Sequence, residues 1–284
     1  MKLKEYWKHI DLYELWTHPE PLQTSETAAI VTNILEFFIA EEKGKRLIPD
    51  DKDKQRSLLR AILNVRIPVE IPEDINHALD RLLWTERVQA GIVNPFRKYE
   101  EKEYNGISLW KGDITRIGVD AIVNAANAAL LGCFKPLHSC IDNAIHSAAG
   151  PRMRQDCAKL MALQGKNEVT GTAKITRAFN LPSRFVIHSV GPIVRGPLND
   201  GHRSALASCY RSILDLAAET GAIDTLAFCG ISTGLFGYPA DEAAPLAVDT
   251  VKAWLGENPG RISKILFDLF SEEDYERYRR VISA

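Results

Sequence analysis

The stretch Asp120-Ala-Ile-Val-Asn-Ala-Ala-Asn127 decides the fold, because it has the pattern of a buried strand that runs directly into a ligand loop. The apolar residues at positions 121–123 predict a strand at residues 121–124. The small residues between Asn124 and Asn127 allow close backbone packing, while the two amides offer both hydrogen-bond donors and acceptors. Alone this signal is weak, so its meaning depends on the surrounding sequence.

Around this stretch, strands alternate with helices from residue 107 to the last residues of the sequence. Apolar runs predict strands at residues 107–111, 121–124, 173–177, 185–190, 225–229 and 264–269. Helical periodicity predicts helices at residues 140–149, 152–163, 202–219, 239–255 and 272–283. This alternation predicts an α/β fold in which helices cover both faces of a mixed or parallel sheet.

The first hundred residues predict a small helical layer instead. Apolar residues recur at helical spacing in residues 25–42, with Ser25 as the candidate N-cap, and amphipathic stretches follow at 52–65 and 73–90. Gly91 can end the last helix. We therefore expect a helical N-terminal region at residues 1–93, a charged, turn-rich linker at 94–106 and an α/β domain at 107–284.

Composition restricts the function classes. The 284 residues are 25% charged and 45% hydrophobic, which is ordinary for a globular protein, and the formal net charge of −2 provides no basic field for nucleic acid. No apolar run reaches the roughly 18 residues that span a bilayer, and the first residues lack the apolar core of a signal peptide. Five cysteines are typical here of reduced thiols. We expect a cytoplasmic protein that binds neither membranes nor nucleic acid.

A glycine-rich loop, Gly230-Ile-Ser-Thr-Gly-Leu-Phe-Gly-Tyr-Pro239, lies between a predicted strand and a predicted helix. Glycines let the backbone approach a ligand closely, and a helix N-terminus adds unpaired N–H groups and a positive dipole. These features indicate a phosphate-binding loop. The spacing matches neither the Walker nor the dinucleotide pattern, so an ordinary strand-to-helix turn stays open.

A carboxylate, Asp113, follows the first predicted strand within Leu109-Trp-Lys-Gly-Asp-Ile-Thr115. At a strand end it could accept hydrogen bonds from an exocyclic amine or a ribose hydroxyl. An aspartate that caps a turn explains the same pattern equally well.

A cysteine–histidine cluster lies in Leu131-Gly-Cys-Phe-Lys-Pro-Leu-His-Ser-Cys-Ile-Asp-Asn143, where Asp142 closely follows Cys133, His138 and Cys140. Thiolate and imidazole are preferred zinc donors, and a metal with three protein ligands keeps one position open for chemistry. His138 and Cys140 can share a face only in an extended segment. We therefore predict a loop, with the next helix starting near Cys140.

Two other interpretations of this cluster remain. Spacing alone is equally compatible with two buried thiols beside a hydrogen-bonded histidine. If zinc does bind, a structural site with a fourth ligand, His146 or Cys157, is the main rival to an open site.

In combination, these segments resemble the macrodomain family of ADP-ribose binders over roughly residues 103–284. The motifs that carry the resemblance are Gly112-Asp-Ile-Thr, Asp120-Ala-Ile-Val-Asn-Ala-Ala-Asn, Ile145-His-Ser-Ala-Ala-Gly-Pro, Gly171-Thr-Ala-Lys-Ile-Thr, Val186-Ile-His-Ser-Val-Gly-Pro and Ile231-Ser-Thr-Gly-Leu-Phe-Gly-Tyr-Pro. The resemblance implies a three-layer α/β/α sandwich around a six-stranded mixed sheet. It also implies an ADP-ribose cleft at the carboxyl ends of the strands.

The same resemblance implies roles for individual residues. Asp113 would receive the adenine amino group beside the backbone of Ile114, Phe270 would contact adenine, and Asn127 would face the distal ribose. The diphosphate would be bound by a consecutive run, Ser232, Thr233, Gly234, Leu235 and Phe236.

The cysteine–histidine segment stands where most macrodomains carry a glycine-rich run followed directly by Val-Asp. In this respect the chain resembles the zinc-dependent macrodomains, which are bacterial and fungal protein-ADP-ribose hydrolases with a helical N-terminal extension. The resemblance implies Zn²⁺ bound by Cys133, His138 and Cys140. We expect Asp142 to orient or deprotonate the attacking group and Asn127 to position the distal ribose for catalysis.

The reaction expected is hydrolysis of the bond between C1 of the distal ribose and a modified protein side chain, releasing ADP-ribose. An ester to Asp or Glu is the natural target, because a carboxylate leaves readily. The implied partner is a mono-ADP-ribosylated protein, with a lipoylated carrier resembling glycine cleavage protein H as one candidate and a macrodomain-linked sirtuin as the opposing transferase. The alternatives are a non-catalytic ADP-ribose reader and an esterase that acts on O-acyl-ADP-ribose.

Overall fold

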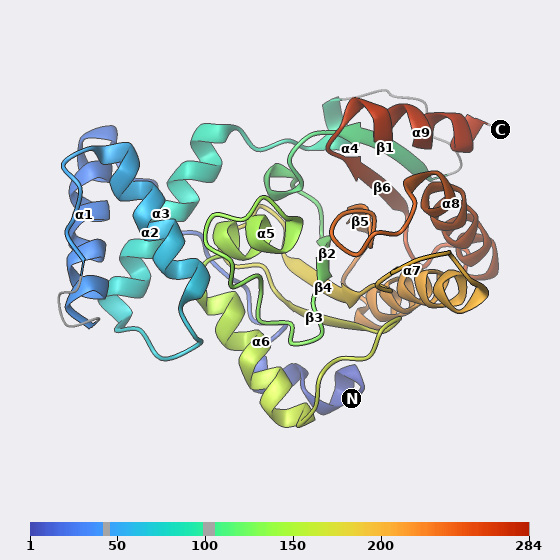
Figure 1. The fold of residues 1–284 in the computed structure, drawn as a ribbon, viewed down its shortest axis with the longest axis horizontal. Helices are drawn as coiled ribbons and strands as arrows, with labels where there is room; N and C mark the ends of the chain where they lie inside the picture. Colours follow the sequence, from blue (N-terminus) through green and yellow to red (C-terminus); the bar gives the residue numbers. More distant parts are fainter. Residues whose placement is uncertain (42–45, 99–105, 284) are drawn as a thin grey trace.

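The computed structural model describes residues 1–41, 46–98 and 106–283, with the elements shown in Figure 1. The N-terminal part contains two 3₁₀ helices and four α-helices: η1 (Leu3–Glu5), η2 (Trp7–Ile10), α1 (Thr24–Glu41), α2 (Lys52–Val65), α3 (Glu73–Ala90) and α4 (Pro95–Lys98). The rest of the chain contains β1 (Ile107–Lys111), η3 (Ile114–Arg116), β2 (Ala121–Ala126), α5 (Ile141–Ala149), α6 (Pro151–Gln164), β3 (Ala173–Arg177), β4 (Phe185–Val190), α7 (Asp200–Thr220), β5 (Thr225–Phe228), α8 (Ala240–Glu257), β6 (Lys264–Leu269) and α9 (Glu272–Ser283).

The six strands form one mixed sheet in the order β1-β6-β5-β2-β4-β3. Every neighbouring pair is parallel except β3 with β4, which is antiparallel. The carboxyl ends of β1, β2, β4, β5 and β6 therefore meet at one edge of the sheet, which is where ligands bind in open α/β folds.

Helices cover both faces of the sheet, as predicted. In Figure 1, α5 and α6 lie on one side and the C-terminal helices α7–α9 on the other. α5 contacts β2 and α6 contacts β3, while α7 contacts β3 and β4 and α9 contacts β1 and β6. The predicted three-layer α/β/α sandwich with a six-stranded mixed sheet is confirmed.

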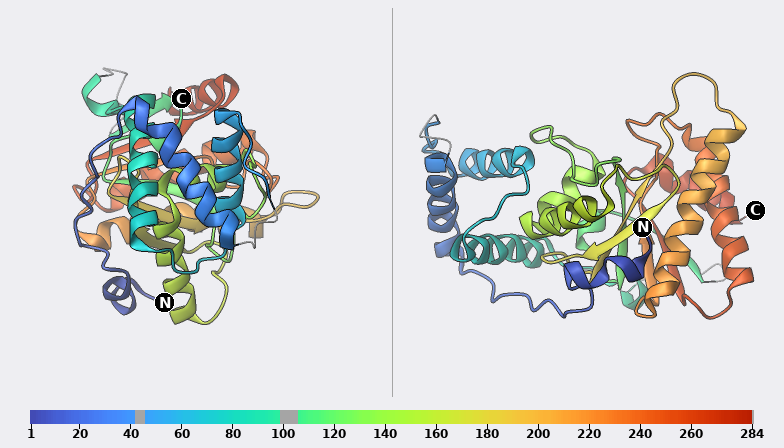
Figure 2. Two further views of the ribbon diagram at one scale, coloured as in Figure 1. Left: turned by 90° about the vertical axis from the view of Figure 1, so that its left-hand side faces the viewer. Right: turned by 90° about the horizontal axis from the view of Figure 1, so that it is seen from below.

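The N-terminal helices α1–α3 form a separate layer beside α5 and α6 (Figures 1 and 2). They enclose a hydrophobic cluster of their own, whose fully buried members include Ile34, Leu35, Phe38, Leu59, Leu79 and Leu82. The side chains between this layer and the α/β part are largely polar. Arg152 Nε, for example, lies 2.8 Å from Asp80 Oδ2.

The first dozen residues pack differently from α1–α3. Leu3, Tyr6, Ile10 and Leu12 are buried in the core of the sheet. Tyr6 Oη accepts a hydrogen bond from the backbone N–H of Ile175 at 3.0 Å, which occupies a donor on the edge strand β3. The N-terminal segment therefore protects this edge from pairing with another chain.

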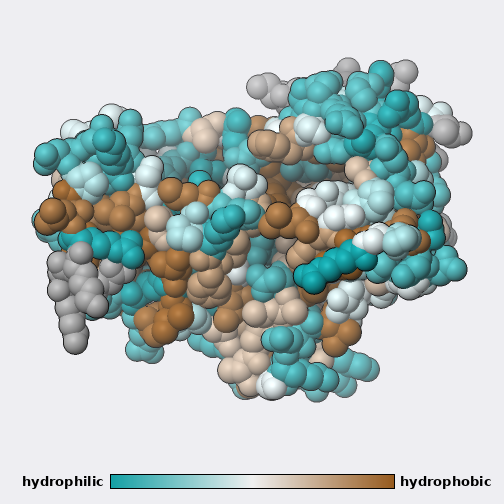
Figure 3. All heavy atoms as spheres, in the orientation of Figure 1, coloured by the Kyte–Doolittle hydropathy of each residue, from teal (hydrophilic) through white to brown (hydrophobic). Residues whose placement is uncertain are grey.

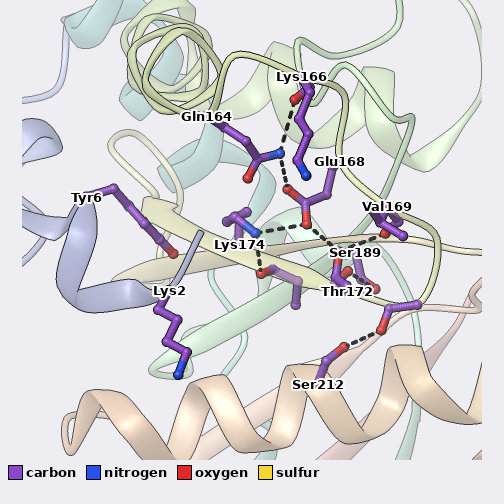
Figure 4. A network of polar contacts seen from close by, with 12 residues as sticks. Lys2, Tyr6, Gln164, Lys166, Glu168, Val169, Thr172, Lys174, Ser189 and Ser212 are labelled. Atoms are coloured by element: carbon purple, nitrogen blue, oxygen red, sulfur yellow. Dashed lines mark hydrogen bonds and ion pairs between the residues drawn. The ribbon is translucent and has the colours of Figure 1, made fainter.

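A buried ion pair stabilises the same edge (Figure 4). Lys174 Nζ on β3 lies 2.8 Å from Glu168 Oε1, and both side chains are almost fully enclosed. Gln164 Nε2 donates to the other carboxylate oxygen of Glu168 at 2.9 Å. The backbone N–H of Glu168 donates to Ala128 O at 2.8 Å, so this network also supports the loop that follows β2.

Several predicted boundaries differ from the structure. α1 begins at Thr24, so Ser25 is inside the helix and is not its N-cap; the Glu26 side chain instead accepts the Gln23 N–H at 2.8 Å. β2 continues to Ala126, because Ala125 and Ala126 pair with the end of β4. Part of the predicted linker forms α4, and residues 99–105 of the linker lie outside the described residues.

The surface is mixed in hydropathy, with a hydrophilic covering over α9 (Figure 3). Helix α9 buries Tyr278, Ile282 and also Arg277, whose guanidinium pairs with Asp241 on α8. In the described parts of the chain, no helix combines the length and apolar character needed to cross a bilayer.

Candidate active site

The predicted site residues follow strands whose carboxyl ends meet at one edge of the sheet. Asp113 follows β1, Asn127 follows β2, the loop of residues 230–239 follows β5, and Phe270 follows β6. The parallel topology thus brings together residues that are far apart in the sequence.

Cys133, His138 and Cys140 come together in a loop of irregular backbone between β2 and α5. Their donor atoms lie within 4.8 Å of one another, and all three side chains are half-buried. Cys140 is the N-cap of α5, where its Sγ accepts the Asn143 N–H at 3.4 Å. The predictions of a loop and of a helix that starts near Cys140 are confirmed.

The cluster has dimensions that suit zinc. Cys133 Sγ and His138 Nδ1 are 3.7 Å apart, while a tetrahedral zinc with Zn–S near 2.3 Å and Zn–N near 2.0–2.1 Å separates neighbouring donors by roughly 3.5 Å. Burial, followed by the neighbouring Cys133 thiol, raises the pKa of Cys140 to about 11 against the lowering effect of the Asn143 N–H. A bound cation would deprotonate such a thiol, since metal binding releases the proton.

Asp142 is buried in the first turn of α5, two residues after the candidate ligand Cys140. Asn124 Nδ2 donates to one carboxylate oxygen at 2.8 Å and Asn127 Nδ2 to the other at 3.2 Å. Burial raises the pKa of Asp142 to about 6, although the two amides and the Arg154 guanidinium favour the charged form. A carboxyl group with this pKa can accept a proton near neutral pH.

Asn127 links Asp142 to the loop of residues 132–140, which we call the metal loop because it carries the candidate ligands Cys133, His138 and Cys140. Its Nδ2 also donates to Gly132 O at 2.9 Å, and its Oδ1 accepts the Ala129 N–H at 3.0 Å. Gly132 has a φ of +80°, and a Cβ there would come within 2.8 Å of the His146 ring, so a glycine is required. The amide therefore fixes the start of the metal loop and the orientation of Asp142 together.

The loop of residues 230–239 has the shape of a backbone cradle. Ser232 adopts a φ of +66°, is buried, and its Oγ has no hydrogen-bond partner among the described residues. Gly234 and Leu235, in the middle of the loop, are exposed, whereas Thr233 and Phe236 on either side of them are half-buried. The loop ends at Pro239, the N-cap of α8, so the helix N-terminus that we predicted beside it is present.

Asp113 follows the edge strand β1, whereas the metal loop follows β2. Strands β6 and β5 lie between these two strands in the sheet. Its Oδ1 accepts hydrogen bonds from Thr115 N at 2.9 Å and Thr115 Oγ1 at 2.7 Å, as the capping interpretation predicted. Its side chain is 45% exposed, which leaves the other oxygen, Oδ2, accessible to a ligand. Ile114 is buried beside it and Phe270 is almost fully exposed.

Two residues near Asp113, Arg87 and Asp268, were not predicted from the sequence to belong to the site. Arg87 of α3 donates to Thr115 Oγ1 at 2.6 Å and lies 3.8 Å from Asp113 Oδ2. Asp268 of β6 is buried, and burial together with the Asp113 charge raises its pKa to about 8. An acidic residue in the otherwise apolar run at residues 265–269 is the signal that could have identified Asp268.

A second group of potential metal ligands, His146, Cys157 and His188, is fully buried beneath α5. His188 Nδ1 is 3.1 Å from Asn124 Nδ2 and its Nε2 is 2.9 Å from Thr176 Oγ1, so both ring nitrogens already have partners. His188 is therefore a hydrogen-bonded core residue, whereas neither ring nitrogen of His146 has a hydrogen-bond partner among the described residues, and His146 Nε2 lies 3.6 Å from Asp142 Oδ1. His146 and Cys157, the candidate fourth zinc ligands, belong to this buried group rather than to the loop cluster.

Comparison with known proteins gives concordant results. A family model described as "Macro domain" matches residues 123–247. A Treponema medium protein named "Protein-ADP-ribose hydrolase" is 46% identical over 88% of this chain and 97% of its own length. A mutant macrodomain of Oceanobacillus iheyensis solved with ADPR is 38% identical and superposes with a TM-score of 0.58, covering 65% of this chain and 95% of its own.

A further solved structure also includes the N-terminal layer in its match. The Trypanosoma brucei macrodomain in complex with ADP-ribose is 25% identical, has a TM-score of 0.57, and covers 94% of this chain and 99% of its own. The match to this structure therefore extends into the N-terminal layer.

Proposed function

Because the chain belongs to the macrodomain family, we propose that it is a zinc-dependent protein-ADP-ribose hydrolase that removes mono-ADP-ribose from modified side chains. The observation that carries the proposal is the cluster of three metal donors directly before a buried carboxylate, at the edge where an ADP-ribose ligand belongs. A relative that is 46% identical, and that this chain matches over 97% of the relative's length, is named "Protein-ADP-ribose hydrolase".

The residues around the cleft suit ADP-ribose in a defined orientation. Asp113 would receive the adenine amino group, the backbone of residues 232–236 would bind the diphosphate, and Asn127 would face the distal ribose. Exposed Phe270 would pack against adenine. This orientation places C1 of the distal ribose near the metal loop.

Cys133, His138 and Cys140 would hold the zinc, which supplies Lewis-acid polarisation and an open coordination position. Asp142 would orient the attacking water and take its proton, since the pKa of Asp142 lies about one unit below neutral. Water adds its oxygen to C1 of the ribose, the bond from C1 to the acceptor oxygen breaks, and the acceptor leaves as a carboxylate. We favour an Asp or Glu ester because that leaving group needs no further protonation.

The acceptor we propose is a mono-ADP-ribosylated cytoplasmic protein, with a lipoylated carrier resembling glycine cleavage protein H as the first candidate. A macrodomain-linked sirtuin would be the opposing transferase. A reducing compartment suits the half-buried Cys133 and Cys140 thiols, which lie close together in the loop.

The test is to incubate the full chain with acceptors mono-ADP-ribosylated on Asp or Glu, on arginine and on serine, with and without a zinc chelator. Release of ADP-ribose from the ester-linked acceptor, stopped by chelator and restored by zinc, is expected. Tight binding without release would identify a reader. Turnover of O-acetyl-ADP-ribose alone would identify an esterase.

A further inference from the structure

The metal loop is held by residues from outside the α/β part of the chain. Asn64, in the last turn of α2, is 1% exposed and faces the loop. Its Oδ1 accepts the backbone N–H of Leu137 at 3.0 Å, while its Nδ2 donates to Ser147 Oγ on α5 at 3.0 Å. One side chain thus joins the N-terminal layer, the loop and the helix that follows it.

The Leu137 backbone explains why such a contact is needed. Leu137 has a φ of +53°, in the left-handed region that is unfavourable for a residue with a Cβ. It directly precedes the metal-ligand candidate His138 and is itself half exposed, so burial does not hold it there. A strained conformation persists only where its surroundings enforce it, and the Asn64 hydrogen bond is placed to do so.

Arg60, one turn before Asn64 on α2, supports the same loop through Asn143. Arg60 Nη2 donates to Asn143 Oδ1 at 3.0 Å. The Asn143 amide nitrogen then points at the loop carbonyls of Lys135 at 3.2 Å and Cys133 at 3.5 Å, and the Asn143 N–H reaches Cys140 Sγ. The guanidinium therefore orients a side-chain amide that contacts the Cys133 end of the cluster, while the backbone of the same residue contacts Cys140.

Arg154 of α6 secures α2 itself. It donates hydrogen bonds to the carbonyls of Leu63 and Arg66, both at 2.7 Å, at the C-terminal end of α2 where a cation is favoured. The Arg154 guanidinium also lies 4.9 Å from the ring centroid of Phe134 in the metal loop. α2 is consequently attached to the α/β part at the point where it meets the loop.

We propose that α2 is an integral part of the metal site and that Asn64 is a positioning residue for zinc. By holding Leu137 in its left-handed conformation, Asn64 keeps His138 near the two cysteines before the metal arrives. The inference rests on the proposed zinc role. Loss of a group that orients metal ligands typically costs about 10–100-fold in metal affinity.

The test compares zinc affinity in the wild-type chain, Asn64→Ala and the matched control Asn76→Ala. Asn76 is also a buried asparagine of the N-terminal layer, 4% exposed, but its Nδ2 donates to Ile71 O, away from the loop. Competition with a chromophoric chelator should show zinc binding weakened about 10-fold or more in Asn64→Ala and changed less than about threefold in Asn76→Ala. Circular dichroism of each zinc-free variant establishes that it is folded.

Arg60→Met provides a second, milder variant if Asn64→Ala does not fold, since Arg60 is only partly buried; the expected loss is about three- to tenfold. Wild-type zinc affinity in a folded variant that lacks Asn64 or Arg60 would overturn the inference and leave the zinc proposal intact. A wild-type chain that binds no zinc would overturn both. An equal loss in Asn64→Ala and Asn76→Ala would reduce the effect to general destabilisation and also contradict the inference.

Discussion

The two loops that follow β2 and β5 at one edge of the sheet keep their shapes in different ways. Backbone hydrogen bonds hold the loop of residues 230–239. Within the loop, Tyr238 N donates to Ser232 O and Gly237 N donates to Gly234 O, both at 3.0 Å. From the segment after β4, Val194 N donates to Phe236 O at 2.7 Å. The metal loop is held by side chains, chiefly Asn127, Asn143 and Asn64.

This difference separates two tasks that we assign to the same edge of the sheet. A loop built on backbone hydrogen bonds suits phosphate binding, because its N–H groups are the ligand donors and need no particular side chain. A loop built on side-chain contacts can present thiols and an imidazole, and single substitutions can disturb it. We therefore expect variants of the first loop to change ligand affinity and variants of the second to change turnover.

The largest effect is expected for Cys140→Ala in the metal loop. Loss of a zinc ligand removes transition-state stabilisation of several kcal/mol, so ADP-ribose release should slow by about 100-fold or more. ADP-ribose affinity, measured by isothermal titration calorimetry, should stay within about threefold, because the phosphate loop is untouched. Cys209→Ala, which changes a buried cysteine of α7, should retain turnover; similar loss in both variants would mean that the effect is structural.

Asp113→Ala should weaken ADP-ribose binding by about 10–100-fold, the range for a hydrogen bond to a charged group. A ligand with hypoxanthine in place of adenine lacks the exocyclic amine, so it should bind the wild-type chain weakly and lose little more in the variant. An equal loss for both ligands would show that Asp113 does not read the amine. Zinc content should be unchanged in this variant.

Gly191→Ala should disturb the phosphate loop without touching the metal loop. A Cβ at Gly191 would come within 2.0 Å of Ser232 Oγ and 2.8 Å of Ile231 Cγ2, and overpacking of this kind costs about 1–3 kcal/mol. We expect at least about fivefold weaker ADP-ribose binding. Gly256→Ala, where a Cβ would meet no atom within 4 Å, is the control; unchanged affinity in both would contradict the assigned role of this loop.

The smallest effect is expected for Asp268→Asn, which should change how the thermal stability of the folded chain depends on pH. Its folded-state pKa of about 8 exceeds the usual value of 3.8, so the folded chain holds an extra proton between these limits and becomes less stable as pH rises through this window. Asp268→Asn removes this ionisable group and so removes its contribution to the loss of stability at higher pH. Its melting temperature should exceed the wild-type value at pH 8 by a few degrees, about 2–4 °C for each kcal/mol recovered, and by less at pH 5. An equal difference at both pH values would contradict the raised pKa.

The fold could be predicted largely from the sequence, because its signals are local. Mostly apolar runs such as Lys264–Leu269, and the glycine-marked loop after β5, each indicate their local structure within ten residues. The parallel topology then determines that Asp113 and Asn127 reach the same edge. The metal loop was also predictable, since its three donors lie within eight residues.

The residues that hold the site's loops in position could not be predicted, because the residues that they contact are distant in the sequence. Asn64 and Arg87 stand on amphipathic helices, where polar residues normally face solvent, yet Asn64 contacts Leu137 and Arg87 contacts Thr115. The raised pKa of Asp268 likewise depends on burial and on Asp113, which lies far away in the chain. Such contacts arise only when two layers pack together.

The most direct test of the account is a titration of zinc into the metal-free chain with simultaneous measurement of bound metal and of ADP-ribose release from an ester-linked acceptor. We predict no release without metal, a rise in proportion to bound zinc, and a plateau at one zinc per chain, while ADP-ribose binding is present throughout. Full release from a chain that holds less than about one tenth of an equivalent of metal would contradict the account.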